Sequence, residues 1–192
     1  MRIHSPEFQA MSERVPRVTE LTSRLNVLPF EDEEGNAELL ELILGRPLPP
    51  RVTIYPPFYT DHGRNLDLAE RVFINQGCTF LDYAGIRLGE RVMVAPKATF
   101  ITVGHPVDTE DRQMWLTGGP IDVAENVWIS ACATILPGVS IGRDSVIAAG
   151  AVVADDVPAQ SLVTGTKATV RRTWRPLVRS AESIVSDGPT TP

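Results

Sequence analysis

The sequence has few aromatic side chains, cysteines and histidines, and it carries no excess of positive charge. Aromatic residues make up 6% of its 192 residues, cysteine occurs twice, histidine occurs three times, and the formal net charge is −6. Because Cys78 and Cys132 show no metal-like spacing and are too few for a disulfide framework, we expect them to be reduced, small and buried. No metal is predicted. An acidic chain also offers no electrostatic footprint for nucleic acid.

Long apolar runs are missing as well. None approaches the roughly 20 residues that cross a bilayer, and the N-terminus lacks the apolar block of a signal peptide. We therefore predict a cytoplasmic protein with no membrane partner. The hydrophobic share of 43% is enough to bury the core of one domain with appended ends.

The first fifty residues lack the pattern that governs the rest. Residues 1–15 show no period and are predicted to be a flexible leader, with the helical segment in residues 16–50. Pro16 suits the first position of one helix, Asn36 can cap a second, and Gly45 can end it. The second helix is indicated by one apolar stripe, made of Leu39, Leu40, Ile43 and Leu44.

A six-residue repeat dominates the segment that follows, residues 51–172. In lines of six from Val123, the first position is always aliphatic and β-branched, and the fifth is always small or β-branched. Neither helix nor strand periodicity gives six, whereas a coil of short parallel strands that turns every sixth residue does. Three hexads make one triangular coil, and the pattern predicts four coils, at 68–85, 88–105, 123–140 and 141–158.

The repeat is interrupted twice, by a slip at residues 86–87 and by a loop at residues 106–122 that begins directly after His105. A coil of this kind stacks aliphatic residues in a narrow core and so needs few aromatics. Its open ends and flat faces require caps and favour an oligomer. Helix 36–45 and residues 159–175 are the expected caps, and residues 173–192 are a C-terminal tail.

The hexads resemble those of the hexapeptide-repeat acyltransferases. Within that family, the closest resemblance is to the galactoside, maltose and nodulation-sugar O-acetyltransferases. It implies an all-β fold, a left-handed parallel β-helix with a short N-terminal helical cap, assembled as a homotrimer with active sites between subunits. The motifs that carry it are PPFYTDHGRN (56–65), FINQGC (73–78), APKATFITVGHPVD (95–108) and NVWISACATILPGVSIG (126–142).

His105 is the predicted catalytic base. Imidazole is mostly the free base at neutral pH, so it can take a proton from a hydroxyl that attacks a thioester. His105 ends a coil, precedes Pro106 and starts the one long loop in the repeat, and loops of that length are usually functional or disordered. In the resembled family, the histidine of the Gly-His-Pro motif is the base.

The resemblance also implies the reaction, which is direct transfer of an acetyl group from acetyl-CoA to a hydroxyl of a sugar or sugar-like small molecule. Two alternatives stay open: acetylation of an antibiotic or other natural product at oxygen or nitrogen, and a non-catalytic β-helical assembly protein. Met114 and Trp115 in the loop could face a more apolar acceptor or pack against a neighbouring subunit.

The resemblance assigns acceptor contacts to Asn75 and Asp61, with Asp82 as a further candidate. Asn75 occupies the second position of its hexad, which points away from the core. Trp128 packs a corner or a subunit interface and could line the site.

For coenzyme A, Ala148 and Ala149 are small enough to let a pantetheine arm approach the backbone, and Ser130 could donate a hydrogen bond through its backbone or its hydroxyl. The phosphates would meet the cationic group that is formed by Lys167, Arg171 and Arg172. Relatives commonly have an apolar residue where Lys167 stands.

Overall fold

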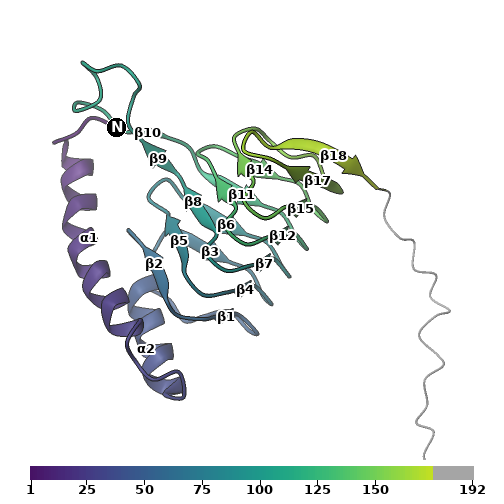
Figure 1. Ribbon diagram of the computed structural model, residues 1–192. Helices are drawn as coiled ribbons and strands as arrows, with labels where there is room; N and C mark the ends of the chain where they lie inside the picture. The colour runs from purple at the N-terminus through teal and green to yellow at the C-terminus, as the bar shows by residue number, and fades with distance from the viewer. Residues whose placement is uncertain (175–192) are drawn as a thin grey trace, which may run out of the picture.

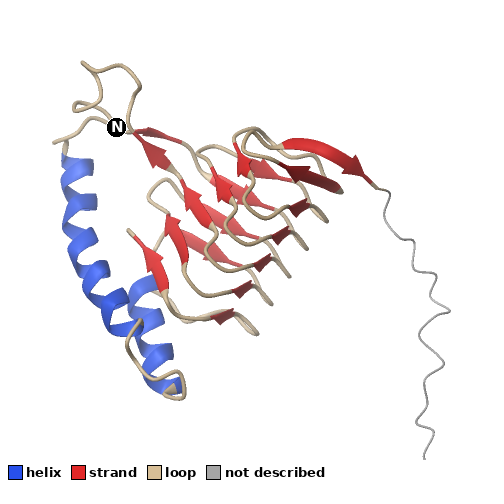
Figure 2. Cartoon of the chain, viewed as in Figure 1, coloured by secondary structure: helices blue, strands red, loops and turns tan. Residues whose placement is uncertain are grey.

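The computed structural model describes residues 1–174, which form a parallel β-helix of about six turns with two helices packed against it (Figures 1 and 2). The coils pile up along one axis, and each is a triangle whose sides belong to three different sheets. In the described part of the chain, no helix combines the length and apolar character needed to cross a membrane.

One side of the prism, called sheet I here, contains the most strands. All its strands run parallel except the last, which turns back on its neighbour. In spatial order they are β1 (Thr53–Ile54), β4 (Phe73–Ile74), β7 (Met93–Val94), β12 (Trp128–Ile129), β15 (Val146–Ile147), β17 (Ser161–Thr164) and β18 (Thr169–Thr173).

The other two sides are parallel throughout. Sheet II consists of β2 (Phe58–Thr60), β5 (Cys78–Leu81), β8 (Thr99–Ile101), β13 (Thr134–Ile135) and β16 (Val152–Val153). Sheet III consists of β3 (Leu66–Leu68), β6 (Ile86–Leu88), β11 (Ile121–Val123) and β14 (Ser140–Ile141). The chain visits sheets I, II and III in turn, so each coil has a I/II corner and a II/III corner.

The hexad positions in residues 123–158 that were predicted to point inward all do so. The six first-position residues from Val123 to Val153 are at most 1% exposed, and the fifth-position residues from Val127 to Val157 are at most 6% exposed. In sheet I the inward residues stack in register through the whole domain, as Ile54, Ile74, Val94, Ile129, Ile147 and Val163. This confirms the repeat and its phase.

In the second half of the domain, the chain turns at every sixth residue, so the strands between successive turns are short. The backbone is left-handed at Asn126, Cys132, Gly138, Asp144 and Gly150, with φ between 56° and 81°. Because this turn position points outward, Cys132 is exposed, and the expectation that it is buried is wrong; Cys78 is buried as expected.

Helix α1 (Pro6–Leu25) starts ten residues earlier than predicted. Ser5 caps it by accepting a hydrogen bond from the backbone N–H of Phe8, and Pro16 lies inside the helix rather than at its start. The leader predicted for residues 1–15 is therefore helical from Pro6. Helix α1 packs on sheet II and on α2, burying Val18, Leu21 and Leu25.

Helix α2 (Glu33–Leu44) also begins earlier than predicted. Asp32, not Asn36, caps it by accepting from the N–H of Gly35, while Asn36 lies in its first turn. Gly45 ends the helix in the left-handed conformation (φ 72°), as expected. The predicted apolar stripe is buried against the first coil, so α2 covers the open end of the core.

The opposite end is closed by the β17–β18 hairpin, as expected for the segment 159–175. From residue 175 on, the predicted tail lies outside the described residues.

Two details of the predicted repeat need correction. The predicted domain, residues 51–172, holds one coil before the first of the four that the hexads indicate, and this coil is formed by β1, β2 and β3. The protruding loop is also placed differently, because residues 121–123 already belong to the coil as β11, which pairs with β6 and β14.

Candidate functional site

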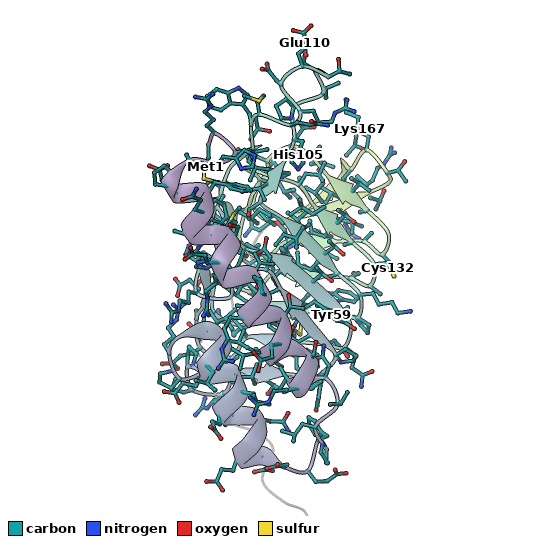
Figure 3. The ribbon with its side chains drawn as sticks, turned by 90° about the vertical axis from the view of Figure 1, so that its left-hand side faces the viewer. Met1, Tyr59, His105, Glu110, Cys132 and Lys167 are labelled. Atoms are coloured by element: carbon teal, nitrogen blue, oxygen red, sulfur yellow. The ribbon has the colours of Figure 1, made fainter. Side chains whose placement is uncertain are left out.

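The loop leaves the solenoid at the II/III corner of the third coil and stands on a two-stranded stalk. Strand β9 (Val103–Gly104) pairs antiparallel with β10 (Thr117–Gly118), and residues 105–116 extend beyond it. A β-carbon on Gly118 would collide with the carbonyl oxygen of Thr102, so the stalk closes only with glycine there. Figure 3 shows His105 at the base of this loop and Glu110 at its tip.

His105 is held by a backbone carbonyl. Its Nδ1 lies 2.8 Å from the carbonyl oxygen of Arg112 across the loop. A carbonyl oxygen can only accept, so Nδ1 must carry the proton. In the neutral ring, Nε2 then has the free lone pair, and the ring is exposed. Nε2 is therefore the nitrogen that can act as a base.

The loop is braced by Arg112 as well as by its carbonyl. The Arg112 guanidinium donates to the carbonyl oxygen of Val107 at 2.7 Å, and its backbone N–H donates to the carbonyl oxygen of Asp108 at 3.0 Å. These bonds fold the loop back on the segment that follows His105. The sequence gives no sign of this role, because the group that contacts the imidazole is part of the backbone.

Thr102 ties the stalk to the coil below. The side chain is fully buried, and its hydroxyl donates to the carbonyl oxygen of Leu81 at 2.5 Å while accepting from the N–H of Ala84 at 3.0 Å. Its carbonyl accepts from the N–H of Gly119 at 3.0 Å. Both limbs of the stalk are thereby fixed to the II/III corner of the second coil.

Asp82 lies in that corner and is fully buried, so its predicted role as an acceptor contact is wrong. Its carboxylate is used to close the corner of the first coil. The donors to it are the hydroxyl of Thr60 and the backbone N–H groups of His62, Gly63 and Asn65, at 2.5 to 3.1 Å. Four donors to one carboxylate satisfy it without any ligand.

Asp61 lies beside Asp82 and is partly exposed. Its Oδ1 accepts from the backbone N–H of Asp82 at 2.9 Å. Burial, and then the hydrogen bond with the Asp82 carboxylate and its charge, raise the pKa of Asp61 to about 7. At neutral pH, Asp61 is therefore a mixture of carboxylic acid and carboxylate.

This pKa makes stability depend on pH. Since the pKa of Asp61 is higher in the folded chain than in the unfolded one, the folded state is progressively disfavoured as pH rises from about 4 to about 7. Asp61→Asn removes that dependence, because an amide can donate to Asp82 and accept from its N–H. We expect the variant to gain of the order of 1 kcal/mol over wild type at pH 8, a figure reduced for solvent screening.

Urea unfolding at pH 5 and pH 8 measures this difference. Equal changes in the free energy of unfolding at the two pH values would show that Asp61 is not a protonated acid in the folded chain.

The I/II corner carries four of the predicted site residues, Asn75, Ser130, Ala148 and Ala149, in one column. Backbone hydrogen bonds join successive coils there, from Asn75 N–H to Val94, from Ser130 N–H to Ile147 and from Ala148 N–H to Val163, at 2.9 to 3.0 Å. Asn75 lies in the second coil, Ser130 in the fourth and Ala148 with Ala149 in the fifth. The Oδ1 of Asn75 accepts from the N–H of Gln76 at 2.8 Å.

Ser130 cannot donate its backbone N–H to a ligand, because that group is used by Ile147. The hydroxyl remains as the one candidate donor of this residue. Ala149 is exposed and Ala148 is half-buried, so small side chains line the surface of the column as expected.

Lys167 lies at the top of the same column. It is exposed in the turn between β17 and β18, and the flanking residues Gly165 and Ala168 bond the backbone of Val152 in the coil below. Arg171 and Arg172 are exposed on β18, next to a bulge in its pairing with β17.

Trp128 lies on neither corner. It points outward from the middle of sheet I, is 47% exposed and pairs with Met93 below and Val146 above.

Within one chain, the site residues thus form two groups at different corners of the prism. His105 and Asp61 belong to the II/III corner, whereas Asn75, Ser130, Ala148, Ala149 and Lys167 belong to the I/II corner. Sheet II lies between the two groups.

Known proteins share both the repeat and the chain fold. A family model described as bacterial transferase hexapeptide, with six repeats, matches residues 120–155. A galactoside O-acetyltransferase of Lactococcus lactis subsp. lactis is 30% identical over 172 residues, which cover 88% of this chain and 83% of the relative. The chain belongs to the hexapeptide-repeat acetyltransferases.

Two further relatives agree with this assignment. A Schizosaccharomyces pombe protein, provisionally named an acetyltransferase, is 40% identical over 144 residues, covering 74% of this chain and 70% of the relative. The structure of a hexapeptide-repeat acetyltransferase from Vibrio cholerae O1 biovar eltor, complexed with acetyl coenzyme A, matches with a TM-score of 0.81 and 31% identity, over 91% of this chain and 92% of that one.

The family assignment confirms the predictions of a left-handed parallel β-helix and of an acetyltransferase. The acetyl coenzyme A in the Vibrio cholerae structure agrees with the predicted co-substrate.

Proposed function

We propose that this hexapeptide-repeat acetyltransferase moves an acetyl group directly from acetyl-CoA to a hydroxyl of a sugar or sugar-like acceptor, with Nε2 of His105 as general base. The observation that carries the proposal is the bond between Nδ1 of His105 and the Arg112 carbonyl, because it leaves the lone pair on Nε2. A neutral imidazole in this form presents its basic nitrogen to whatever approaches the exposed edge of the ring.

The transfer requires no covalent enzyme intermediate. Nε2 takes the acceptor's hydroxyl proton while the oxygen attacks the thioester carbonyl, and backbone N–H groups stabilise the resulting oxyanion. The C–S bond then breaks, and the departing thiolate takes the proton from the imidazolium. The products are the acetyl ester and free coenzyme A.

A second copy of the chain would complete the site, in line with the predicted homotrimer. If the copies pack around an axis parallel to the solenoid, equal coils stay at equal heights. The I/II corner of one copy then comes beside the II/III corner of the next, with His105 at the height of the third coil. Asn75 lies one coil below that height and Ser130 one coil above it.

The faces of the prism differ in composition, and one of them is suited to association with another copy. The outward residues of sheet III include Asp67, Arg87 and Asp122, and the Arg87 guanidinium bonds both oxygens of Asp122 at 2.6 and 2.7 Å. In the middle of sheet I, from β4 to β15, the outward residues are instead apolar: Phe73, Met93, Trp128 and Val146. A contiguous apolar strip of this kind favours an interface.

Asn75 is the proposed acceptor contact on the neighbouring copy, and Asp61 is the one at the same corner of the prism as the base, two coils below it. An amide and a partly ionised carboxyl can each donate and accept, as sugar hydroxyls require. The name of the Lactococcus lactis relative, a galactoside O-acetyltransferase, favours a sugar.

The proposal is tested by following thiol release from acetyl-CoA over a panel of sugars, amino sugars, aminoglycosides and hydroxylated natural products. We expect His105-dependent turnover with at least one sugar hydroxyl. Turnover confined to amines would indicate N-acetylation. A folded protein that gives no His105-dependent turnover with any acceptor would favour an assembly role. A stable monomer in sedimentation would contradict the shared site.

A separate prediction concerns Lys167 and the binding of the acetyl donor, acetyl-CoA. A lysine ammonium group next to a coenzyme A phosphate forms a charge-assisted hydrogen bond. Lys167→Ala should therefore raise KM for acetyl-CoA by about ten-fold with little change in kcat. Steady-state kinetics at low salt measure this. Arg143→Ala removes an exposed cation at a different corner and is the matched control. Equal effects of the two variants would mean that only net charge matters.

The cytoplasm, where acetyl-CoA is available, stays the predicted location.

A further inference from the structure

The N-terminal residues pair with the loop that carries His105. The N–H of Ile3 donates to the carbonyl oxygen of Met114 at 2.8 Å, and the N–H of Leu116 donates to the carbonyl oxygen of Met1 at 2.9 Å. Between these bonds, Arg2 and Trp115 form an antiparallel bridge. Met1 to Ile3 thus lie as an added strand along the returning limb of the loop.

This added strand is continuous with a helix that is seated on the solenoid. Helix α1 begins at Pro6, directly after the Ser5 cap. Its Arg14 donates to the carbonyl oxygens of His62 at 3.0 Å and Ile43 at 2.7 Å. At its far end, the Asn26 amide both donates to and accepts from the backbone of Phe58, at 3.1 and 2.8 Å.

A second contact holds the strand from the side of the corner. The Tyr83 hydroxyl lies 3.2 Å from the sulfur of Met1, and Tyr83 follows Asp82 in the II/III corner of the second coil. Figure 3 shows Met1 at the top of α1, near His105 at the base of the loop. The segment therefore links the helix, the corner and the loop.

The hydrogen bond between Nδ1 of His105 and the Arg112 carbonyl lies close to this pairing. Arg112, whose carbonyl holds Nδ1 of His105, is two residues before Met114. The stalk fixes the loop at residues 103–104 and 117–118, but residues 105–116 lie beyond it. Pairing with Met1 and Ile3 fixes residues 114–116, and so limits where the Arg112 carbonyl can go.

We propose that the backbone of Met1 to Ile3 is a positioning element for His105: it holds the loop so that the Arg112 carbonyl keeps the imidazole in the Nδ1–H form. Met1 and Ile3 are positioning residues, since they act through the loop and not on the substrate. The effect on turnover rests on the proposed role of His105 as base, whereas the effect on the tautomer does not.

Ile3→Pro tests the proposal in the full chain. Proline removes the N–H that bonds Met114, while its fixed φ and the extended preference of the preceding residue suit a strand. Ile3→Ala and Ile3→Val keep the N–H and are the matched controls. Leu116→Pro removes the second bond from the loop side and replaces Ile3→Pro if that variant does not fold.

The first readout is the tautomer of His105, from ¹⁵N NMR of histidine-labelled protein, with the His105 signals assigned by their loss in His105→Ala. In wild type and in the Ile3→Ala and Ile3→Val controls, we expect the Nδ1–H form. In Ile3→Pro we expect both tautomers. An unchanged tautomer in a folded Ile3→Pro, with the Leu116→Pro variant unchanged as well, overturns the proposal.

The second readout is kinetic. A small displacement of a catalytic group costs up to about 100-fold, so kcat of Ile3→Pro should fall about ten- to a hundred-fold while KM for acetyl-CoA stays near wild type. A lower kcat with an unchanged tautomer counts against the positioning role. A mixed tautomer in a protein that acetylates no acceptor would leave the positioning role standing and refute the proposed function.

Discussion

His105→Ala lowers kcat by about 10² to 10⁴, the range that a positioned general base contributes, while the affinity for acetyl-CoA stays close to wild type. The alanine removes the one nitrogen, Nε2, whose lone pair the Arg112 carbonyl leaves free. Because the imidazole is exposed, its loss creates no cavity and should not lower the stability of the solenoid. Pre-steady-state and steady-state thiol release, together with calorimetric titration of acetyl-CoA, separate chemistry from binding.

The matched control lies on the same loop. Glu110 is exposed at the tip, and Glu110→Gln removes a charge without touching the bonds around the imidazole (Figure 3). We expect Glu110→Gln to keep wild-type kcat. If His105→Ala retains more than about a tenth of the wild-type kcat on the best acceptor, general-base catalysis by His105 is wrong, since even a weak general base contributes more.

The sequence was most informative where the fold repeats itself. Each coil uses the same inward positions, so one set of hexads predicted the phase of the solenoid strands from Leu68 to Val157, although not of β9 and β10 in the stalk. The hexads did not reveal the first coil, because its corner from Asp61 to Asn65 is longer than a hexad allows. The same extra length after β5 accounts for the slip at residues 86–87.

Helix α1 was placed too late because Pro16 resembles a helix start. A proline inside a helix costs roughly 3 kcal/mol through a missing hydrogen bond and a steric clash. Here Pro16 is on the exposed side, and the buried stripe of Val18, Leu21 and Leu25 stabilises the helix from the other face. Tertiary packing therefore outweighs the local propensity, and only the structure shows it.

In the candidate site, too, the sequence predicted some groups and missed others. His105 was predicted because the repeat breaks directly after it. Asn75, Ala148 and Ala149 were predicted because their hexad positions place their side chains on the outside of the coil. The Arg112 carbonyl could not be found, since a backbone group has no residue type. Asp82 was misassigned because a carboxylate that closes a corner looks the same in sequence as one that binds a ligand.

Phe80→Ala is the substitution with the largest expected effect on stability. Phe80 is fully buried on sheet II between Phe58 below and Phe100 above, with ring centroids 5.6 and 4.7 Å away. Its ring is nearly parallel to that of Phe100, at 11°. Removing it leaves a cavity in the middle of a column one residue wide, which neighbouring coils cannot fill without breaking their register. We expect a loss of about 3 to 5 kcal/mol in the free energy of unfolding.

Thr79→Ala is the matched control, because Thr79 lies on the same strand and points outward. Its expected change is below about 0.5 kcal/mol, as for a surface substitution. Urea unfolding at one fixed subunit concentration gives both values, since an oligomer would make stability depend on concentration. A loss under about 1 kcal/mol for Phe80→Ala would mean that the column relaxes into the space.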